Sequence, residues 1–465
     1  MNWNTATEES STTTTLFDDA FFEALRKEEF SRLDETGQTY LDYTGGNLYG
    51  VSQLQKHMEI MQRNVMGNPH STNPSSQYAT KLVEGARKRV LDFFNAGEDY
   101  YCIFTSNASG ALQIVGECYP FQDKGYFMLL ADNHNSVNGI REYCRERGGD
   151  FEYVRIKAED LTIQPEELEE SLTAHDDKKN KLFAFPAQSN VSGVKHDLNW
   201  VAKAKAKGWD VLLDAAAFVP TSKLDLKKIQ PDFVSVSFYK IFGHPTGIGC
   251  LLLHKSKFEK LKKHWFAGGT VTVVSVVEPK HFLANNHERF ENGTVDYLNI
   301  PAISIGLDFI ENIGIDRINK RISSLTSFLI HQLNELHHSN GKPLLKIFGP
   351  GESAQRGASI VLNFFDEDGK KFDYEFIEAE ANKHLISIRS GCFCNPGIDE
   401  INNCLTNEEI SRFFTSNPQV TSTKEFLDFV GKMRGATRVS VGMSTVKRDL
   451  EKFLDFAKSL IDTKA

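Results

Sequence analysis

The sequence predicts an α/β protein with a large domain and a smaller second domain. From about residue 40 to residue 249, short apolar runs that end in Gly, Ser, Asp or Asn alternate with helical stretches. Such runs are typical of strands that are buried on both faces and joined by helices, as in a parallel sheet. The length of 465 residues also exceeds one ordinary single-core domain and suits two or three.

Five apolar runs are predicted to be strands of the large domain: Tyr101–Thr105, Tyr126–Ala131, Leu182–Pro186, Asp210–Leu213 and Phe233–Ser237. In a sheet of this kind the ligand lies beyond the carboxyl ends of the strands. Polar groups follow every one of these runs, at residues 105–110, 132–134, 189–190, 214–217 and 237–240. We therefore expect the functional site along this edge of the sheet.

Changes in composition divide the chain. We predict a mobile Ser/Thr/Glu-rich tail over residues 1–15, then a large domain over 16–300 whose first residues can pack on the small domain. A glycine-marked loop at 293–300 precedes an apolar-periodic helix, Ile303–Ile313, and we place the small domain at 301–465.

The small domain is predicted to have its own strands and a closing helix. The helix carries an i, i+3, i+4, i+7 apolar stripe from Leu450 to Ile461. Residues 398–435 are predicted to form a polar, partly helical insertion between two strands. The predicted strands are Ala358–Phe364, Ile386–Ser390 and Thr437–Val441.

Composition excludes several classes of function. The chain has 62 acidic and 53 basic residues, a formal charge of −9, and lacks the basic block expected of a nucleic-acid-binding protein. Its longest apolar runs, such as Val271–Val277, are too short to span a bilayer. The N-terminus has neither the basic region nor the hydrophobic core of a secretory signal, and the seven cysteines are an odd number. We therefore expect a cytoplasmic protein without a nucleic-acid or membrane partner.

Two residues at predicted strand ends suggest a cofactor. Asp214 follows a buried run, and Lys240 follows Phe233–Ser237 after a short bend. Separately, these residues are most often a helix cap and a surface lysine. Together they suit pyridoxal 5′-phosphate (PLP), because a desolvated lysine amine forms a Schiff base with an aldehyde and a buried carboxylate keeps a pyridine nitrogen protonated.

A phosphate group would need a site of its own. The segment from Thr105 to Gly110 follows a strand and opens a predicted helix, Ala111–Cys118, so its backbone N–H groups can face an anion at the positive end of the helix dipole. Ser237 could add a hydroxyl, His134 could stack on the ring, and Asn190 could donate a hydrogen bond to the ring oxygen.

The lysine segment, residues 237–249, strongly resembles that of the class V aminotransferase superfamily. Within the superfamily it is most similar to the N-terminal PLP domain of molybdenum cofactor sulfurases, which are relatives of cysteine desulfurases. Further blocks of the family follow in order from about Tyr40 to the C-terminus. They are Tyr40–Tyr43, Gly67–Ser71, Asn133–Val137, Pro186–Asn190, Leu213–Ala217, Glu291–Thr294, Arg389–Gly397 and Arg438–Gly442.

The resemblance implies PLP fold type I: a large domain with a mostly parallel seven-stranded sheet between helices, and a smaller α/β C-terminal domain. It also implies that Lys240 binds PLP covalently, Asp214 pairs with the pyridine nitrogen, and His134 stacks on the ring. The remaining cofactor contacts that it implies come from Asn190 at the ring hydroxyl, from Ala108, Ser109 and Ser237 at the phosphate, and from Thr294 of a neighbouring subunit. A homodimer follows from that last contact.

The resemblance further implies a substrate site and a reactive thiol. Arg389 would clamp the substrate carboxylate with its guanidinium fork, and Asn68 would also contact the substrate. Cys394 lies five residues beyond Arg389, the spacing at which one branch of the desulfurases carries its persulfide-forming cysteine. Cys392 is the rival thiol, because alternation along an extended segment puts both cysteines on the same side. No second Cys or His pair at zinc spacing accompanies them, so we expect no metal.

Some positions depart from the family pattern. Many relatives have a glutamine three residues after the aspartate and a histidine just before the lysine, where this chain has Ala217 and Tyr239. The cofactor sulfurases share this departure. The matched blocks continue to the end of the sequence, so we expect it to lack the C-terminal domain of those sulfurases.

We therefore predict a cysteine desulfurase-like enzyme that converts L-cysteine to L-alanine and forms a persulfide on Cys394, for delivery to an acceptor protein or small molecule. Alternatives on the same fold are a carbon–sulfur lyase, an epimerase or an aminotransferase. These reactions need Lys240 and Asp214 but not Cys394. A third alternative is a non-enzymatic module that keeps PLP as a structural ligand.

Overall fold

The computed structural model describes residues 16–465 except 123, 352–354, 417–424, 426–428 and 430–433. The predicted tail at 1–15 lies outside the described residues, and so does part of the predicted insertion at 398–435. The described part of the insertion contains helices α14 (Pro396–Asn402) and α15 (Asn407–Ser416).

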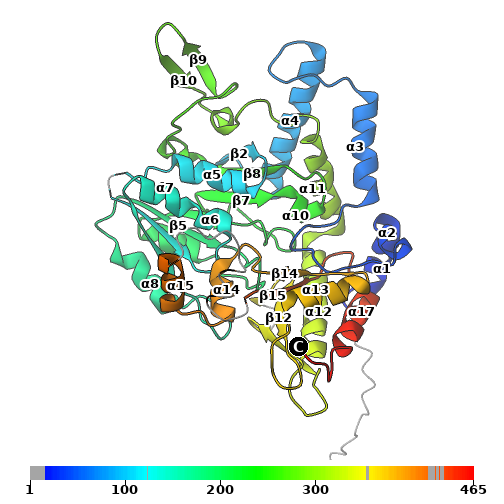
Figure 1. Ribbon diagram of the computed structural model, residues 1–465. Coiled ribbons are helices and arrows are strands. Elements are labelled where there is room, and N and C mark those ends of the chain that lie inside the picture. The colour runs from blue at the N-terminus through cyan, green and yellow to red at the C-terminus, as the bar shows by residue number, and fades with distance from the viewer. Residues whose placement is uncertain (1–15, 123, 352–354, 417–424, 426–428, 430–433) are drawn as a thin grey trace, which may run out of the picture.

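A seven-stranded sheet forms the centre of the large domain (Figure 1). Its strand order is β2-β8-β7-β6-β5-β3-β4, and only β8 runs antiparallel to its neighbours. The strands are β2 (Tyr100–Thr105), β3 (Gly125–Leu130), β4 (Asp150–Val154), β5 (Asn180–Pro186), β6 (Asp210–Asp214), β7 (Phe233–Ser237) and β8 (Gly249–His254). The prediction of a mostly parallel sheet is confirmed, and the five strands predicted from apolar runs are all present.

Both faces of this sheet are buried, because successive side chains point to opposite faces. On β3, Phe127 and Leu129 belong to one core cluster and Met128 and Leu130 to the other. Helices α5 (Ala108–Cys118), α6 (Asn135–Asn138) and α7 (Ile140–Glu146) contribute to the first cluster. The second cluster includes residues from helices α4 (Pro74–Phe93), α8 (Pro165–Ala174), α9 (Trp200–Ala206), α10 (Phe238–Phe242) and α11 (Pro301–Ile313).

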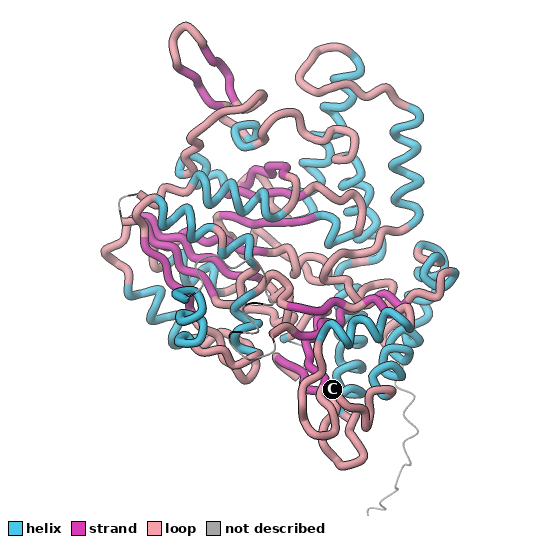
Figure 2. Tube along the Cα trace, in the orientation of Figure 1, coloured by secondary structure: helices cyan, strands magenta, loops and turns pink. Residues whose placement is uncertain are grey.

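The small domain is built on a four-stranded antiparallel sheet of order β11-β12-β15-β14. The strands are β11 (Leu345–Phe348), β12 (Ser359–Phe364), β14 (Arg389–Gly391) and β15 (Ala436–Ser440). Helices α12 (Ile315–Asn334), α13 (Tyr374–Lys383) and α17 (Lys447–Lys458) complete the domain, as Figure 2 shows. The predicted strand at 386–390 is divided in two, because β13 (Ile386–Ser387) pairs in parallel with β1 (Thr39–Tyr40) instead of joining this sheet.

The contacts of helices α11 and α12 show where the packing of the large domain ends and that of the small domain begins. Helix α11 contacts α4, α10 and helix α3 (Val51–Arg63), whereas α12 contacts β11, β12 and α17. The change of packing therefore falls at Gly314, between α11 and α12. At the other end of the chain, helices α1 (Asp19–Glu29) and α2 (Arg32–Glu35) precede β1.

A hairpin of β9 (Val271–Ser275) and β10 (Lys280–Leu283) projects from the large domain on the side away from the small domain (Figure 1). It lies between two short 3-10 helices, η1 (Lys255–Lys260) and η2 (His287–Phe290). In the part of the chain that the structure describes, no helix combines the length and apolar character needed to cross a membrane.

Candidate active site

A cavity of about 270 Å³ lies at the carboxyl ends of the strands of the large sheet. Its walls come from the segments that follow β2, β3, β5, β6 and β7, which is where polar groups were predicted to converge. Seven predicted site residues line it: Ala108, Ser109, His134, Asn190, Asp214, Ser237 and Lys240. The structure thus brings together the residues proposed to hold PLP, with the exception of Thr294.

Lys240 lies on α10, a single helical turn that directly follows β7. Phe238, Ile241 and Phe242 are fully buried and anchor this turn, so the lysine between them faces the cavity. Burial lowers the pKa of the Lys240 amine, while the charge of Asp214 opposes the shift. A lowered pKa raises the neutral fraction of the amine, which is the form that attacks an aldehyde.

Asp214 is the last residue of β6, and one of its two carboxylate oxygens is held by hydrogen bonds. Its Oδ1 accepts hydrogen bonds from Ser235 Oγ (2.8 Å) and from the Ala216 backbone N–H (3.1 Å). These bonds fix the orientation of the carboxylate at the cavity wall. A carboxylate so placed can hold a proton on a pyridine nitrogen.

His134 forms the N-cap of α6, and its Nδ1 accepts a hydrogen bond from the Ser136 N–H at 3.1 Å. Burial lowers the pKa of the imidazole, and the charge of Lys240 also lowers it, whereas Asp214 raises it. The ring is therefore neutral at pH 7 and carries its proton on Nε2. A neutral aromatic ring at this wall suits stacking on a cofactor ring.

One part of the cavity is suited to a phosphate group. Helix α5 begins at Ala108, earlier than the predicted start at Ala111, because the Asn107 side chain caps it by accepting from the Gly110 N–H. Three serine hydroxyl groups lie around this N-terminus. Ser237 Oγ accepts a hydrogen bond from the Ala108 N–H at 2.9 Å. Ser109 Oγ and Ser136 Oγ are hydrogen-bonded to each other at 2.6 Å. Hydroxyl groups at a helix N-terminus form a donor set for an oxyanion.

A glycine allows this close arrangement. A Cβ at Gly249 would lie 2.6 Å from the Asn107 carbonyl carbon and 2.5 Å from the Val236 oxygen, so only glycine lets β8 approach the α5 N-terminus. With an amine, a carboxylate, a neutral imidazole and this donor set in one cavity, the residues present fit PLP.

Arg389 begins β14 and is not among the residues that line the cavity. Its guanidinium binds Asp42, with Nε 2.9 Å and Nη2 2.8 Å from Oδ2. Buried Arg438 binds the other oxygen of Asp42 at 2.7 Å. Besides burial, the charges of both arginines lower the pKa of the Lys240 amine. In this structure the carboxylate of Asp42 takes part of the Arg389 fork predicted for a substrate.

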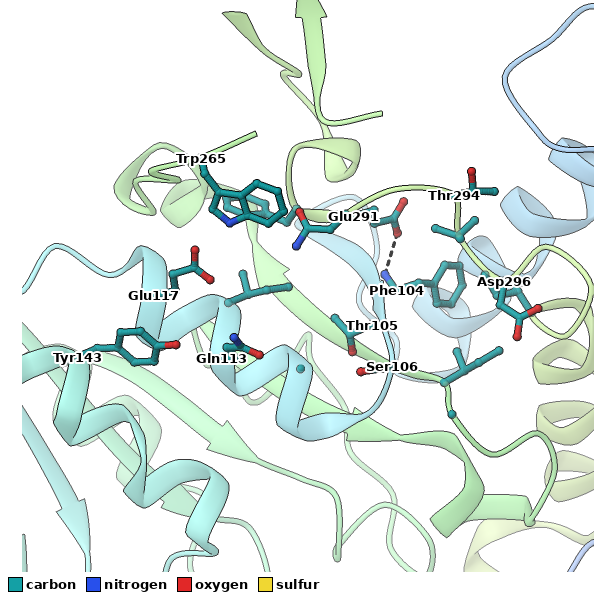
Figure 3. A pocket seen from close by; sticks show the side chains of 18 residues that line it. Phe104, Thr105, Ser106, Gln113, Glu117, Tyr143, Trp265, Glu291, Thr294 and Asp296 are labelled. Carbon is teal, nitrogen blue, oxygen red and sulfur yellow. Dashed lines mark hydrogen bonds between the residues drawn. The ribbon is translucent and has the colours of Figure 1, made fainter. Parts of the chain in front are cut away.

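Asn68 and Thr294 lie together elsewhere. Asn68 Nδ2 is 3.5 Å from Thr294 Oγ1, and Thr294 lines a second cavity of about 770 Å³ (Figure 3). Trp265, Glu117 and Tyr143 line this second cavity as well. Gly247 lines both cavities, so the second one opens beside the α5 N-terminus. Within one chain, neither Asn68 nor Thr294 reaches the Lys240 cavity.

The two candidate thiols differ in their surroundings. Burial and the neighbouring charge of Asp399 raise the pKa of Cys392 to about 12, so this thiol stays protonated near neutral pH. Cys394 is exposed, and its carbonyl oxygen accepts a hydrogen bond from the Asn135 N–H at 2.7 Å, next to His134 on the cavity wall. The two thiols, which sequence geometry alone did not separate, thus differ in exposure.

Sequence reasoning assigned no role to four residues that organise the site: Asp42, Asp132, Asn395 and Arg438. Each lies inside or beside a recognisable block, and Asp132 directly follows a predicted strand. Their pairing joins residues up to 396 positions apart. A single sequence carries no signal for such long-range partners.

The matching family confirms the class of the protein. The chain belongs to the aminotransferase class-V family, whose model matches residues 39–453, and it is a PLP enzyme of that fold. It is similar to the molybdenum cofactor sulfurase of Homo sapiens (35% identity, 95% of this chain and 51% of the relative). The molybdenum cofactor sulfurase of Arabidopsis thaliana is 34% identical over 93% of this chain and 57% of its own length. The chain thus spans about half the length of the curated relatives it matches.

Solved structures confirm the fold. A cysteine desulfurase from Thermococcus onnurineus NA1 superposes with a TM-score of 0.78 at 23% identity, over 97% of this chain and 99% of that one. The cysteine desulfurase CsdA from Escherichia coli gives a TM-score of 0.72 at 18% identity, over 96% of this chain and 100% of that one.

Proposed function

We propose that the protein is a PLP-dependent cysteine desulfurase that moves the sulfur of L-cysteine onto Cys394 and releases L-alanine. The observation that carries this proposal is the exposed Cys394 thiol on the loop of residues 392–395 between β14 and α14, hereafter the Cys394 loop, which is tied to the edge of the Lys240 cavity. The Asn135 N–H donates to the Cys394 oxygen at 2.7 Å, and Asn190 Nδ2 donates to the Phe393 oxygen at 2.8 Å. Both donors lie next to or on the cavity wall.

We propose the following roles for residues of the chain. Lys240 would hold the cofactor, and its amine, when free, would be the base available at the substrate Cα. Asp214 keeps the ring nitrogen protonated, and bound PLP supplies an electron sink. Arg389 binds the substrate carboxylate with the part of its fork that Asp42 leaves open, or after the Asp42 contact opens.

Cys394 then takes the sulfur. Its thiolate attacks the substrate sulfur, the S–S bond forms, and the bond between that sulfur and the substrate Cβ breaks. A proton replaces the sulfur on Cβ, so a thiol and cysteine become a persulfide and alanine without an outside oxidant or reductant. The persulfide would pass to an acceptor protein or small molecule.

Products and two serine variants test the proposal. With L-cysteine, the parent should give alanine and a mass increase of one sulfur atom on Cys394. Cys394→Ser should abolish sulfur transfer, whereas Cys392→Ser, the matched control two residues away, should retain it. Pyruvate in place of alanine would favour a carbon–sulfur lyase. Parent-rate sulfur release by Cys394→Ser would contradict the persulfide role.

We also propose a homodimer in which Thr294 of one copy completes the phosphate site of the other. Support comes from the second cavity, which opens beside the α5 N-terminus and is not filled by the described residues of its own chain. The seven free cysteines support a reducing compartment, which we propose is the cytoplasm.

A further inference from the structure

We propose that Asp132 is a positioning residue that holds the Cys394 loop against the cofactor cavity. The proposal rests on the proposed function, in which this loop carries the sulfur-accepting thiol. Asp132 follows β3 and is fully buried. It does not line the cavity and would act only through the residues it binds.

The carboxylate of Asp132 is the centre of a buried polar network. Its Oδ1 accepts from Ser189 Oγ and from Asn395 Nδ2, both at 2.8 Å. Its Oδ2 lies 3.2 Å from Nε2 of His196, which is also buried. A buried carboxylate with donors on both oxygens has one stable orientation, so it is a rigid anchor.

Asn395 connects Asp132 to the Cys394 loop. Its Nδ2 donates both to Asp132 and to Asn190 Oδ1 (3.1 Å), and its Oδ1 accepts from the Ile398 N–H at the start of α14. Asn190 in turn donates to the Phe393 oxygen. The chain of contacts therefore runs from Asp132 through Asn395 and Asn190 to the residue before Cys394.

The backbone shows why the loop needs an anchor. Phe393 and Cys394 are consecutive non-glycine residues in the left-handed region, with φ of 55° and 54°. Such a conformation persists only where the surroundings fix it. The fixing contacts are the side chain of Asn190, the backbone of Asn135, and the Asn395 N–H, which donates to the Cys392 oxygen at 3.0 Å. Without Asp132, Asn395 loses its buried acceptor and the loop can relax away from the cavity.

Two measurements test this role. Asp132→Ala should lower kcat for alanine formation from L-cysteine by roughly 10- to 100-fold, because a small displacement of a reacting group has an effect of that size. KM for L-cysteine and PLP content should not change, since Lys240, Asp214 and Arg389 keep their contacts. The Asn135, Asn395 and Ile398 amides should exchange hydrogen for deuterium faster. Asp132→Asn, which keeps an oxygen for Asn395, should restore most of kcat.

The matched control is Asp232→Ala. Asp232 is equally buried in the same sheet but lies at the start of β7, where it accepts from the Val211 N–H at 2.8 Å. Its loss should lower stability without accelerating exchange in the Cys394 loop. If Asp132→Ala does not fold, Asn395→Ser breaks the same link and should give the same exchange pattern.

The proposal is overturned if Asp132→Ala, or Asn395→Ser in its place, leaves exchange in the Cys394 loop at the parent rate. It is also overturned if kcat falls only in proportion to lost PLP. A parent enzyme that forms no persulfide would refute the proposed function instead, and the exchange data would still decide whether Asp132 anchors the loop.

Discussion

Lys240 shows how one residue gains reactivity from its neighbours. Three buried apolar residues hold its helical turn, and burial lowers the pKa of its amine although Asp214 lies near. A fully solvated lysine would remain protonated at neutral pH and would react slowly with an aldehyde. The short helix after β7 therefore supplies the environment as well as the position.

A direct prediction concerns the covalent link to PLP. The purified protein should absorb visible light, and borohydride reduction should fix the cofactor on Lys240. Lys240→Ala should keep no reduced cofactor on the chain, because it removes the amine that we assign to the cofactor. Peptide mapping of the reduced protein checks this, and Lys195→Ala offers a control on another half-buried lysine. Cofactor fixed to a different lysine in Lys240→Ala would disprove the assignment.

At the level of elements, apolar runs bounded by polar residues predicted five of the seven strands of the large sheet, and β4 and β8 were not among them. Those strands are buried on both faces, so their sequences are apolar throughout. The start of α5 was placed three residues late because the Asn107 cap is a local contact that composition does not distinguish from a turn. The split of 386–390 into β13 and β14 depends on pairing with β1, more than 340 residues away in the sequence, which no local pattern can indicate.

The β9–β10 hairpin has an unusual surface. Val276 is 97% exposed, Val277 89% and Phe282 69%, so apolar side chains cover an element that projects from the domain. A two-stranded hairpin is marginally stable alone, and exposed apolar patches of this kind mark interfaces. The hairpin precedes the loop that carries Thr294, and we assign both to the interface of the proposed homodimer.

Charged residues on the hairpin should therefore weaken the dimer. Val276→Asp combined with Val277→Asp should raise the dimer dissociation constant by roughly tenfold or more, because both valines would lose a buried environment. Sedimentation at graded concentrations measures the change. Phe414→Asp is a matched control, because Phe414 is also exposed but lies on α15, away from the hairpin and the Thr294 loop. A parent protein that is a fully active monomer at micromolar concentration would contradict the interface.

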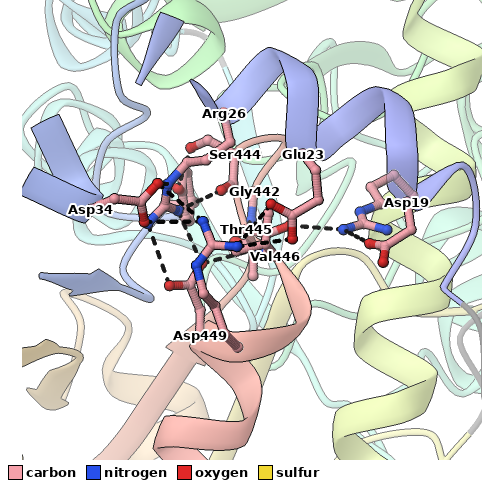
Figure 4. A network of polar contacts seen from close by, with 12 residues as sticks. Asp19, Glu23, Arg26, Asp34, Gly442, Ser444, Thr445, Val446 and Asp449 are labelled. Atoms are coloured by element: carbon pink, nitrogen blue, oxygen red, sulfur yellow. Dashed lines mark hydrogen bonds and ion pairs between the residues drawn. The ribbon is translucent and has the colours of Figure 1, made fainter. Parts of the chain in front are cut away.

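At the scale of the whole molecule, the N-terminal segment is part of the small domain's packing. Arg26 on α1 is buried and binds Asp449 at 3.0 Å, the Ser444 oxygen at 2.7 Å and Asp34 at 2.9 Å (Figure 4). Burial raises the pKa of Asp449, and the charge of Arg26 opposes that shift. The sequence suggested that the first residues can pack on the small domain, but not the partners that hold them there.

Removing one partner of the buried Arg26–Asp449 pair should lower the stability of the protein. Arg26→Ala should lower the free energy of unfolding by about 3–5 kcal/mol, because Asp449 would remain buried without its counter-charge. Arg448→Ala is the matched control: Arg448 is half-exposed and pairs with Glu23 and Asp34, so its loss should cost about 1 kcal/mol or less. Denaturant unfolding of both variants measures the difference, and equal losses would contradict the assignment.

The pairing of Arg26 with Asp449 also sets an order of events during synthesis. These residues are 423 positions apart, so at 5–20 residues per second a ribosome makes the second roughly 20–85 s after the first. Arg26 lacks its carboxylate throughout that interval, and β1 lacks β13 for most of it. The nascent N-terminal segment therefore stays accessible to chaperones and proteases until α17 has emerged. Only then can α1 and α17 form their contacts.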